Sequence, residues 1–446
     1  DDRKRPFVIV DPRAGHGPGI GGFKEDSEVG VALKAGHPVY FVIFFPDPEP
    51  GQTLADVTDA EAEFIRIVDE RHPHAQKPVI IGNCQGGWAV MMLAAARPDI
   101  AGPLVINGAP MSYWAGGDGG SPMRYAGGLL GGAWPALFAS DLGGGKFDGA
   151  TLVDNFERLN PANSLWEKWY HLFANIDTEP HRFLEFERWW GGYYLMNEEE
   201  IRWIVNNLFV GNKLTAGEAR LGPGRYFDLK SIKQPIIVFA SMGDNITPPQ
   251  QAFNWIADIY ESTEEIKAHG QTIVGLLHED VGHLGIFVSG QVAKKEHTQI
   301  VEVLNYIQKL PPGLYGMDIE ETVAPDGTVT YDVTLKERSL EDLRASRGYE
   351  KVDEKPFEAV AALSELLERA YSLLAHPIVR ASTPDWFANA MRDLHPLRVQ
   401  HWAFSDRNPW LWALPSLAAA ASANRKARAG DNAGVRYESL LSATIV

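Results

Sequence analysis

A strand, a tight turn and a helix meet around the single cysteine of this 446-residue chain, and this stretch constrains the fold most. An apolar, β-branched run at residues 78–81 leads into Gly82-Asn83-Cys84-Gln85-Gly86-Gly87. The apolar residues 88–96 then predict a buried helix. Small residues on both sides let a chain reverse sharply and leave the middle side chain exposed above a sheet, as in the pattern G-x-S-x-G. Here the middle residue is Cys84.

Cys84 has two interpretations. A lone cysteine is often no more than a small hydrophobic residue of the core. The flanking glycines, and the helix N-terminus that would favour a thiolate, instead indicate a nucleophile. Because one cysteine forms no disulfide within a chain, we expect a reducing, cytoplasmic compartment.

Strand and helix patterns alternate along most of the chain, which predicts an α/β-hydrolase fold with a mostly parallel sheet and helices on both faces. The apolar run at 38–45 reads as a central strand of that sheet. Residues 111–233 interrupt the alternation and hold many aromatic side chains, some of which we expect to line an acyl pocket. The predicted division is a core (1–110 and 234–310), an inserted cap (111–233) and a C-terminal extension (311–446) with a hairpin at 317–336 and several helices.

An acid and a base follow the nucleophile in the order that this fold uses. Asp244 comes just after the strand at 234–241, at a Gly-Asp turn. Two histidines compete for the base, because His278 and His283 both follow the strand at 271–277. His283 opens an apolar stretch, whereas His278 has acidic neighbours and reads as a solvated loop residue, so His283 is preferred.

An oxyanion hole needs two backbone N–H groups. The first is expected at Gln85, directly after the nucleophile. The second is expected in the glycine-rich loop after the first strand, from one of these consecutive residues: Arg13, Ala14, Gly15, His16 and Gly17. This loop lacks the following helix and the acidic residue of a dinucleotide site. His16 reads as a loop residue rather than a second base.

These residues resemble those of the polyhydroxyalkanoate synthases, α/β-hydrolase relatives with cysteine in a lipase-like box. Gly82 to Gly87 is similar to the family's G-x-C-x-G-G box, and Gly282-His283 fits its histidine. The similarity covers about residues 6–310. The chain departs from that family at Asn245 and Pro249, where synthases usually have His and Trp, and in its longer C-terminal part. It therefore looks like a synthase-like group rather than a standard granule-forming enzyme.

The resemblance implies an acyltransferase that moves a 3-hydroxyacyl group from a CoA thioester onto Cys84 and then onto a hydroxyl. With the same three side chains, a thioesterase or polyester depolymerase is the alternative, and a non-catalytic scaffold on a hydrolase frame is a third hypothesis. We expect acyl-CoA or polyester as substrate, and neither a metal nor a separate cofactor.

The net charge of the chain argues against some classes of binding partner. A formal net charge of -17 gives no support to nucleic-acid binding or to docking on an anionic membrane. No stretch of 18 uncharged apolar residues occurs, so we expect no integral membrane contact. A cytoplasmic protein, located in part at polymer granules, is expected, and assembly into a homo-oligomer stays open.

Overall fold

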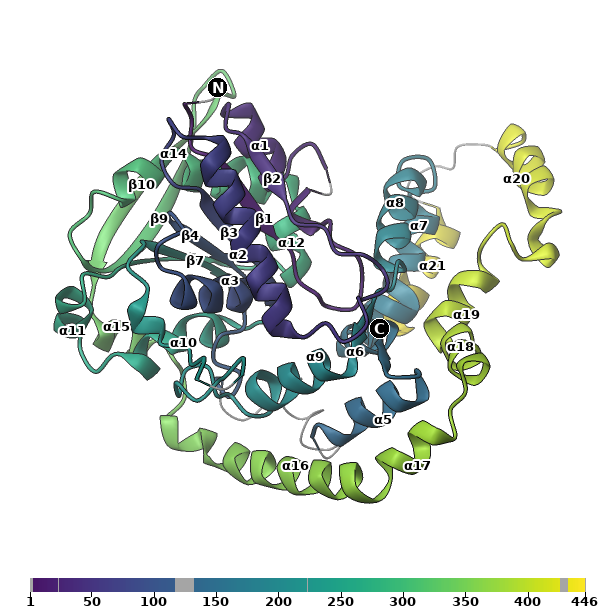
Figure 1. Cartoon of the computed structure of the whole chain (residues 1–446). Helices are drawn as coiled ribbons and strands as arrows, with labels where there is room; N and C mark the ends of the chain where they lie inside the picture. Colours follow the sequence, from purple (N-terminus) through teal and green to yellow (C-terminus); the bar gives the residue numbers. More distant parts are fainter. Residues whose placement is uncertain (1–2, 23, 117–131, 223, 426–431, 446) are drawn as a thin grey trace.

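A computed structural model describes residues 3–22, 24–116, 132–222, 224–425 and 432–445 (Figure 1). Within these residues one sheet of eight strands has the order β10-β9-β8-β7-β4-β3-β1-β2. The strands are β1 (Phe7–Val10), β2 (Val39–Phe41), β3 (Val79–Asn83), β4 (Leu104–Asn107), β7 (Ile236–Ser241), β8 (Thr272–His278), β9 (Gly313–Val323) and β10 (Val329–Arg338). Every neighbouring pair is parallel except β9 and β10. This arrangement confirms the predicted α/β-hydrolase fold.

The apolar runs of the inner strands are continuous because both faces of the sheet are covered. Along β1, Val8 and Val10 pack into one hydrophobic core while Phe7 and Ile9 pack into the other. Helices α2 (Leu54–Arg71), α3 (Gln85–Ala96) and α10 (Pro249–Ile259) supply the first core. Helices α1 (Glu28–Lys34), α12 (His283–Val288) and α14 (Thr298–Ile307) supply the second.

The strand predicted at 38–45 differs from expectation. β2 is only three residues long and lies at the edge of the sheet, so the prediction of a central strand is wrong. The chain leaves the sheet after Phe41: Val42 is still buried in the first core, but Ile43 is 69% exposed and Phe45 82%. Phe44 packs instead under the Arg13 guanidinium, 5.1 Å from its ring centre.

The segment between β4 and β7 is mostly helical and covers the carboxyl ends of the strands (Figure 1). We call this segment the cap. Its elements are α5 (Trp134–Leu142), β5 (Lys146–Asp148), α6 (Ala150–Leu159), η2 (Asn163–Glu167), α7 (Lys168–Ala174), α8 (Pro180–Trp190), β6 (Leu195–Asn197), α9 (Glu198–Ile204) and η3 (Val205–Phe209). The glycine-rich stretch at 117–131 lies outside the described residues.

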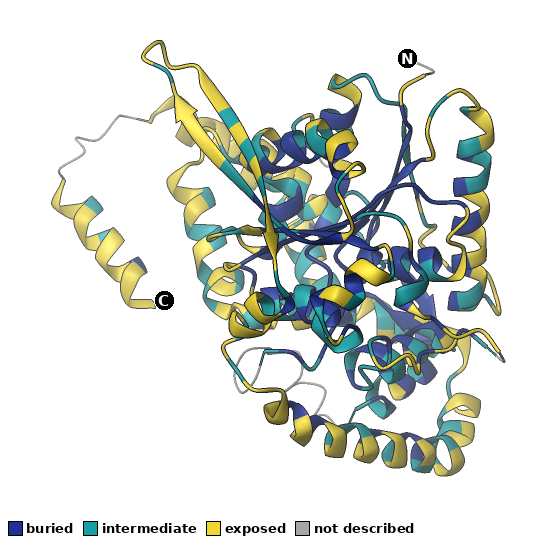
Figure 2. Cartoon of the chain, turned by 90° about the vertical axis from the view of Figure 1, so that its left-hand side faces the viewer, coloured by how far each residue is buried: buried dark blue, intermediate teal, exposed yellow. Residues whose placement is uncertain are grey.

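The hairpin predicted at 317–336 is present as β9 and β10, with its turn at residues 324–327. It does not stand apart in an extension, because β9 pairs with β8 in parallel from Thr272↔Gly313 to Leu276↔Met317. The hairpin therefore enlarges the central sheet, and residue 311 does not mark the end of the core. Its far end is exposed, as Figure 2 shows.

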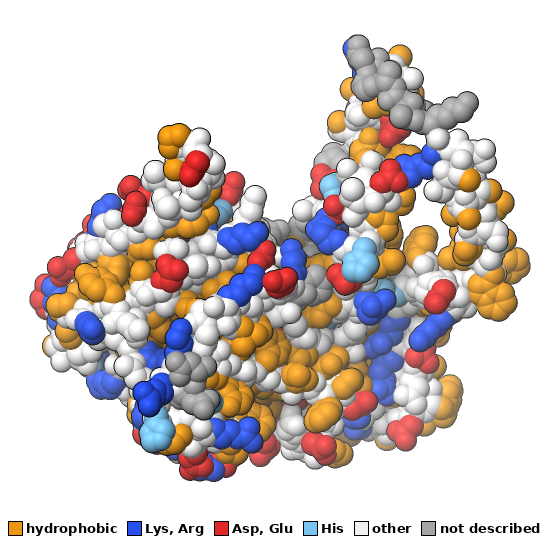
Figure 3. Space-filling model, turned by 90° about the horizontal axis from the view of Figure 1, so that it is seen from above, with side chains coloured by type: hydrophobic (Ala, Val, Ile, Leu, Met, Phe, Trp, Pro, Cys, Tyr) orange, Lys and Arg blue, Asp and Glu red, His pale blue; other side chains and the backbone are white. Residues whose placement is uncertain are grey.

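Residues 355–425 and 432–445 form what we call the arm, a set of helices that runs along the cap (Figure 1). Its described helices are α16 (Lys355–Leu374), α17 (His376–Ala381), α18 (Asp385–Asp393), α19 (Pro396–Ala403), α20 (Leu414–Ala423) and α21 (Ala433–Ile445). Residues 426–431, between α20 and α21, lie outside the described residues. Figure 3 shows hydrophobic side chains on the surface of the arm, and Trp410, Trp412 and Leu417 are 89%, 66% and 62% exposed.

No helix in the described part of the chain combines the length and the apolar character that crossing a lipid bilayer requires.

Candidate active site

Cys84 lies at the turn between β3 and α3, with φ 50° and ψ -121°. A positive φ is uncommon for a non-glycine residue, and its neighbours make it possible. A Cβ on Gly82 would lie 2.7 Å from the Gly86 carbonyl oxygen, and one on Gly87 would lie 2.2 Å from the Ala109 side chain. Only glycine fits at these positions, so the box sequence is explained by packing around the turn.

The structure brings the side chains of Cys84, His283 and Asp244 together, with His283 between the other two. His283 Nε2 lies 3.2 Å from Cys84 Sγ, and His283 Nδ1 lies 2.7 Å from Asp244 Oδ2. The three side chains come from the ends of three different strands or the loops after them, β3, β7 and β8. They are 3% to 6% exposed, so the contacts are screened little by water.

Asp244 is fixed by its own loop. Its Oδ1 accepts hydrogen bonds from the backbone N–H groups of Ile246 and Thr247, at 2.9 and 2.7 Å. The other oxygen, Oδ2, is left for His283. Burial alone would lower the pKa of His283, but the Asp244 carboxylate and the Cys84 sulfur outweigh it and raise that pKa to about 10.

His278, the competing histidine, lies elsewhere. Its Nδ1 accepts from the backbone N–H groups of Asp280 and Val281, both at 3.2 Å. Its Nε2 lies 3.7 Å from Glu296. The geometry therefore pairs Asp244 with His283. His278 is the last residue of β8, opposite Ser241 of β7, and not the solvated loop residue that was expected.

A buried polar network underlies the elbow, and the sequence reasoning missed it. Asn83 Nδ2 donates to Asp11 at 2.9 Å and to Glu28 at 2.7 Å, and Asn107 Nδ2 donates to Glu28 at 2.9 Å. Burial raises the pKa of Asp11 to about 6 and that of Glu28 to about 7. Asparagines at the carboxyl ends of two apolar strands were the available signal.

Asp11 also explains the glycine-rich loop that follows β1. Its carboxylate accepts from the N–H of Gly19 at 2.6 Å and from that of Gly21 at 3.3 Å. A Cβ on Gly21 would lie 2.8 Å from both Asn83 and Glu28. The loop thus folds around a buried carboxylate of its own chain.

The expected second oxyanion donor falls in residues 13–17, which mostly face the cap. The Gly17 N–H donates to Gly192 at 3.1 Å, and the Gly15 carbonyl accepts from Tyr194 at 3.0 Å. Gly17 is therefore engaged with the cap, contrary to its expected place in an oxyanion hole. The backbone comes closest to the elbow before this loop, at the end of β1, because a Cβ on Gly86 would lie 2.3 Å from the Val10 carbonyl oxygen.

The side chains of this loop also join the cap. The Arg13 guanidinium forms an ion pair with Glu200 of α9. His16 is buried, with ring centres 4.2 and 5.1 Å from those of Trp189 and Trp190, and burial lowers its pKa to about 4. Ala14 is buried too. His16 is a neutral packing residue at neutral pH.

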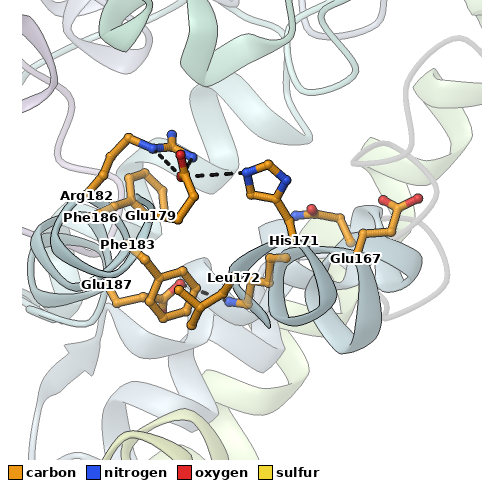
Figure 4. Close-up of a pocket in the computed structure, with 10 residues that line it drawn as sticks. Glu167, His171, Leu172, Glu179, Arg182, Phe183, Phe186 and Glu187 are labelled. Atoms are coloured by element: carbon orange, nitrogen blue, oxygen red, sulfur yellow. Dashed lines mark hydrogen bonds and ion pairs between the residues drawn. The ribbon is translucent and has the colours of Figure 1, made fainter. Parts of the chain in front are cut away.

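Two neighbouring hollows lie in the cap, and one of them reaches this site. One of about 250 Å³ reaches His283, and its walls combine residues of the cap with the loops after β7 and β8, among them Phe156, Asn160, Phe186, Trp190 and Asn245. The other, of about 400 Å³, opens between α7 and α8 (Figure 4) and shares Asn163, Lys168 and Phe186 with the first. In Figure 4 its rim carries Glu179 between Arg182 and His171.

One group of side chains in the described residues has the spacing of a metal site. Ligand atoms of Asp141, Glu198 and His376 lie within 4.8 Å of one another. The Asp141 carboxylate already accepts from Tyr371 at 2.6 Å and contacts His376 Nδ1 at 2.9 Å. The group joins the cap to the arm, and none of its members belongs to the Cys84 site.

Comparison with known proteins places the chain among relatives. The profile of a family described as "Protein of unknown function (DUF3141)" matches residues 1–446. "Uncharacterized protein in ackA 5'region" of Rhizobium meliloti is 49% identical over 456 residues, which cover 100% of this chain and 62% of that relative. The chain thus spans less than two thirds of that relative's length.

More distant similarity links the chain to "Poly(3-hydroxyalkanoate) polymerase subunit PhaC". The protein of that name from Thiocystis violacea is 26% identical over 68% of this chain and 81% of its own length. Among solved structures, the enol-lactonase from Burkholderia xenovorans LB400 aligns with 68% of this chain and 92% of its own, at 14% identity and a TM-score of 0.42.

Proposed function

We propose an acyl-transfer function for this chain, which belongs to the family described as "Protein of unknown function (DUF3141)" and is a polyhydroxyalkanoate synthase-like α/β-hydrolase. In this function Cys84 carries the acyl group during transfer. One observation carries this proposal: a strained elbow cysteine in contact with His283, which in turn contacts Asp244. The polymerase names of the distant relatives support a 3-hydroxyacyl thioester of CoA as the donor.

The first half of the reaction acylates Cys84. His283, whose pKa is raised to about 10, holds on Nε2 the proton taken from the thiol, and the sulfur attacks the thioester carbonyl carbon as a thiolate. The oxyanion accepts a hydrogen bond from the Gln85 N–H, at the first residue of α3, where a helix leaves its N–H groups unpaired. The second donor comes from the N–H groups of Arg13, Ala14, Gly15 or His16, because the Gly17 N–H is engaged with Gly192. The CoA thiolate then leaves and takes the proton from His283.

The second half transfers the acyl group. His283 removes a proton from an acceptor hydroxyl, whose oxygen attacks the Cys84 thioester, and the sulfur leaves as thiolate. Asp244 holds the ring so that Nδ1 keeps its proton and Nε2 faces the sulfur. With a hydroxyacyl chain as acceptor the product is a longer polyester, and with water it is a free acid.

The hollow at His283 favours the hydrolase as the second candidate. It is lined in part by polar side chains, including Glu157, Asn160, Asn163 and Asn245, which can hold water beside the base. The same hollow is the route by which a hydroxyl acceptor would reach His283. The chemistry at Cys84 is common to both candidates.

The test incubates purified protein with 3-hydroxybutyryl-CoA and follows CoA release and the intact mass. Release with growing mass additions on Cys84 supports the transferase, and release with free hydroxy acid supports the hydrolase. Cys84→Ala and His283→Ala should both abolish release. His278→Ala is the matched histidine control and should retain it. Unchanged release by Cys84→Ala would refute the proposal.

A further inference from the structure

Two hydrogen-bond donors lie buried beside the elbow, and in the described part of the chain neither has a partner beyond the weak contact of the Trp88 N–H with the Tyr113 oxygen. The Tyr113 hydroxyl and the Trp88 Nε1–H are inaccessible to solvent, and neither makes a hydrogen bond of normal geometry with any residue that the structure describes. Both side chains are only 4% exposed. A buried donor left unpaired costs about 1 to 3 kcal/mol, so each such group in a folded protein calls for an explanation.

Both donors lie close to the nucleophile. Trp88 is the fourth residue of α3, in the turn directly after Cys84. Tyr113 lies on the loop after β4, and this loop passes the elbow and His283, because Ala109 packs against Gly87 and Gly108 lies near His283 Cε1. Burial raises the pKa of Tyr113 well above its ordinary value, the charge of Cys84 raises it further, and the neighbouring Trp88 N–H lowers it. Tyr113 therefore keeps its proton at neutral pH.

The backbone of Tyr113 is held from two sides. Its N–H donates to Asn212 at 2.7 Å, and its carbonyl accepts from the Gln251 side chain at 3.2 Å. The N–H groups of Met111 and Ser112 both donate to the Gln251 carbonyl at 3.0 Å. The Tyr113 ring also packs against Phe209, with centres 5.1 Å apart. Such a rigid hold fits a side chain that positions a substrate.

We propose that the Tyr113 hydroxyl, supported by the Trp88 N–H, donates a hydrogen bond to an oxygen of the acyl group carried on Cys84. This inference rests on the proposed function, because it needs an acyl group at Cys84. Trp88 would donate to the Tyr113 oxygen and orient its proton toward the acyl group. The accepting oxygen is either the thioester carbonyl or a 3-hydroxyl, and both accept a hydrogen bond in the same way.

The test compares Tyr113→Phe with Tyr193→Phe. Tyr193 is the matched control, because its hydroxyl is also buried and unpaired, but the charges acting on it come from Arg398, Glu157, Glu187 and Asp148 and not from Cys84. Four acyl donors are used: the CoA and 4-nitrophenyl esters of butyrate and of 3-hydroxybutyrate. The rate of Cys84 acylation is followed by stopped-flow and intact mass.

Tyr113→Phe should slow acylation by roughly 10- to 100-fold, whereas Tyr193→Phe should stay within about twofold. An equal loss with butyryl and 3-hydroxybutyryl donors assigns the bond to the carbonyl, and a loss confined to the hydroxylated donors assigns it to the 3-hydroxyl. The melting temperature of Tyr113→Phe should fall only slightly, because the hydroxyl that is removed has no partner among the described residues other than the weakly placed Trp88 N–H. A merely structural tyrosine would give a lower melting temperature without this kinetic loss.

The outcomes separate the two proposals. Equal rates for Tyr113→Phe and Tyr193→Phe would overturn the role of Tyr113 and leave Cys84 as the nucleophile. Acylation by the nitrophenyl esters but not by the CoA esters would refute CoA as the donor, while the Tyr113 comparison would still hold. Failure of all four donors to acylate Cys84 would overturn both proposals.

Discussion

The two carboxylate oxygens of Asp244 have different partners, and replacing one of these oxygens tests their roles separately. Oδ1 holds the loop through Ile246 and Thr247, and Oδ2 faces His283. In Asp244→Asn the amide oxygen can keep the loop bonds, whereas the NH₂ group would face His283 Nδ1. The ring would then carry its proton on Nε2, toward the sulfur, and could not accept the thiol proton.

We therefore expect Asp244→Asn to lower kcat by roughly 10⁴-fold with little change in melting temperature. Steady-state CoA release and a thermal melt measure the two effects. A loss below about tenfold would show that Asp244 does not set the tautomer of His283.

At the scale of residues, the order and spacing of Cys84, Asp244 and His283 were enough to predict which side chains meet. The strand ends of a parallel sheet lie at one edge, so side chains far apart in sequence converge there. Glu28 gave no comparable signal, because an acidic residue in the first turn of a helix is ordinarily a solvated one. Its burial under Asn83 and Asn107 depends on the fold as a whole.

At the scale of elements, the elbow depends on the absence of side chains. Gly87→Ala would place a Cβ 2.2 Å from the Ala109 side chain, and this contact cannot relax without moving α3 or the loop after β4. Gly282 is the matched control, because a Cβ there meets nothing within 4 Å and its φ of -69° suits any residue.

We expect Gly87→Ala to lose on the order of 1 to 3 kcal/mol of unfolding free energy and Gly282→Ala to stay within about 0.5 kcal/mol. Urea denaturation measures both. An unchanged midpoint for Gly87→Ala would contradict the packing described around the turn.

The network beneath the elbow makes stability depend on pH. The pKa of Glu28 is raised by burial from 4.5 to about 7, so the folded state binds a proton more tightly than the unfolded state. Stability is then fully present below pH 4.5 and falls as the pH rises to about 7, by on the order of 3 kcal/mol from this group. Asp11 and Glu61 act in the same direction, because burial raises their pKa values to about 6 and about 7.

Buried His16, whose pKa is lowered to about 4, acts in the opposite direction, so the test is a comparison: between pH 4.5 and 8 the melting temperature of Glu28→Gln should rise relative to that of the wild type. Glu63→Gln is the exposed control, on the solvent side of α2, and should leave the slope unchanged. Equal pH dependence in the wild type and in Glu28→Gln would contradict the direction assigned to Glu28.

The elements themselves were predicted well where an apolar run is covered on both faces, as in β1, β3, β4 and β7. The run at 38–45 is equally apolar, yet only Val39–Phe41 join the sheet, at its edge. Periodicity reports that side chains are apolar but not which neighbour covers them. The pairing of β9 with β8 could not be predicted for the same reason, because strand pairing depends on contacts between distant parts of the chain.

At the scale of the whole molecule, the arm holds the cap. Asp141 of α5 is fully buried and accepts from Tyr371 of α16 while it contacts His376 of α17. Arg398 of α19 pairs with Asp148 of β5 at 2.8 Å, and Trp166 of η2 donates to Ser442 of α21 at 2.8 Å. No feature of the sequence predicted these contacts, since the residues lie more than 200 positions apart.

Asp141→Ala should release this part of the arm, because the buried Tyr371 and the partly exposed His376 lose their acceptor. We expect a loss of roughly 2 to 4 kcal/mol and faster hydrogen exchange at residues 376–403, with the central sheet protected as before. Asp177→Ala is the control: it removes an exposed ion pair with Arg425 and should cost less than about 1 kcal/mol. Equal exchange in both variants would show that Asp141 does not anchor the arm.

The contact between Asp141 and Tyr371 also sets an order of events at the ribosome. The two residues are 230 positions apart, so at about 5 to 20 residues per second the cap waits roughly 10 to 50 s for its partner to be synthesised. During that interval the face of α5 that the arm later covers is open to other proteins. The cap of the nascent chain therefore needs protection until α16 has been synthesised. By then the segments that carry Cys84 and His283 have already emerged.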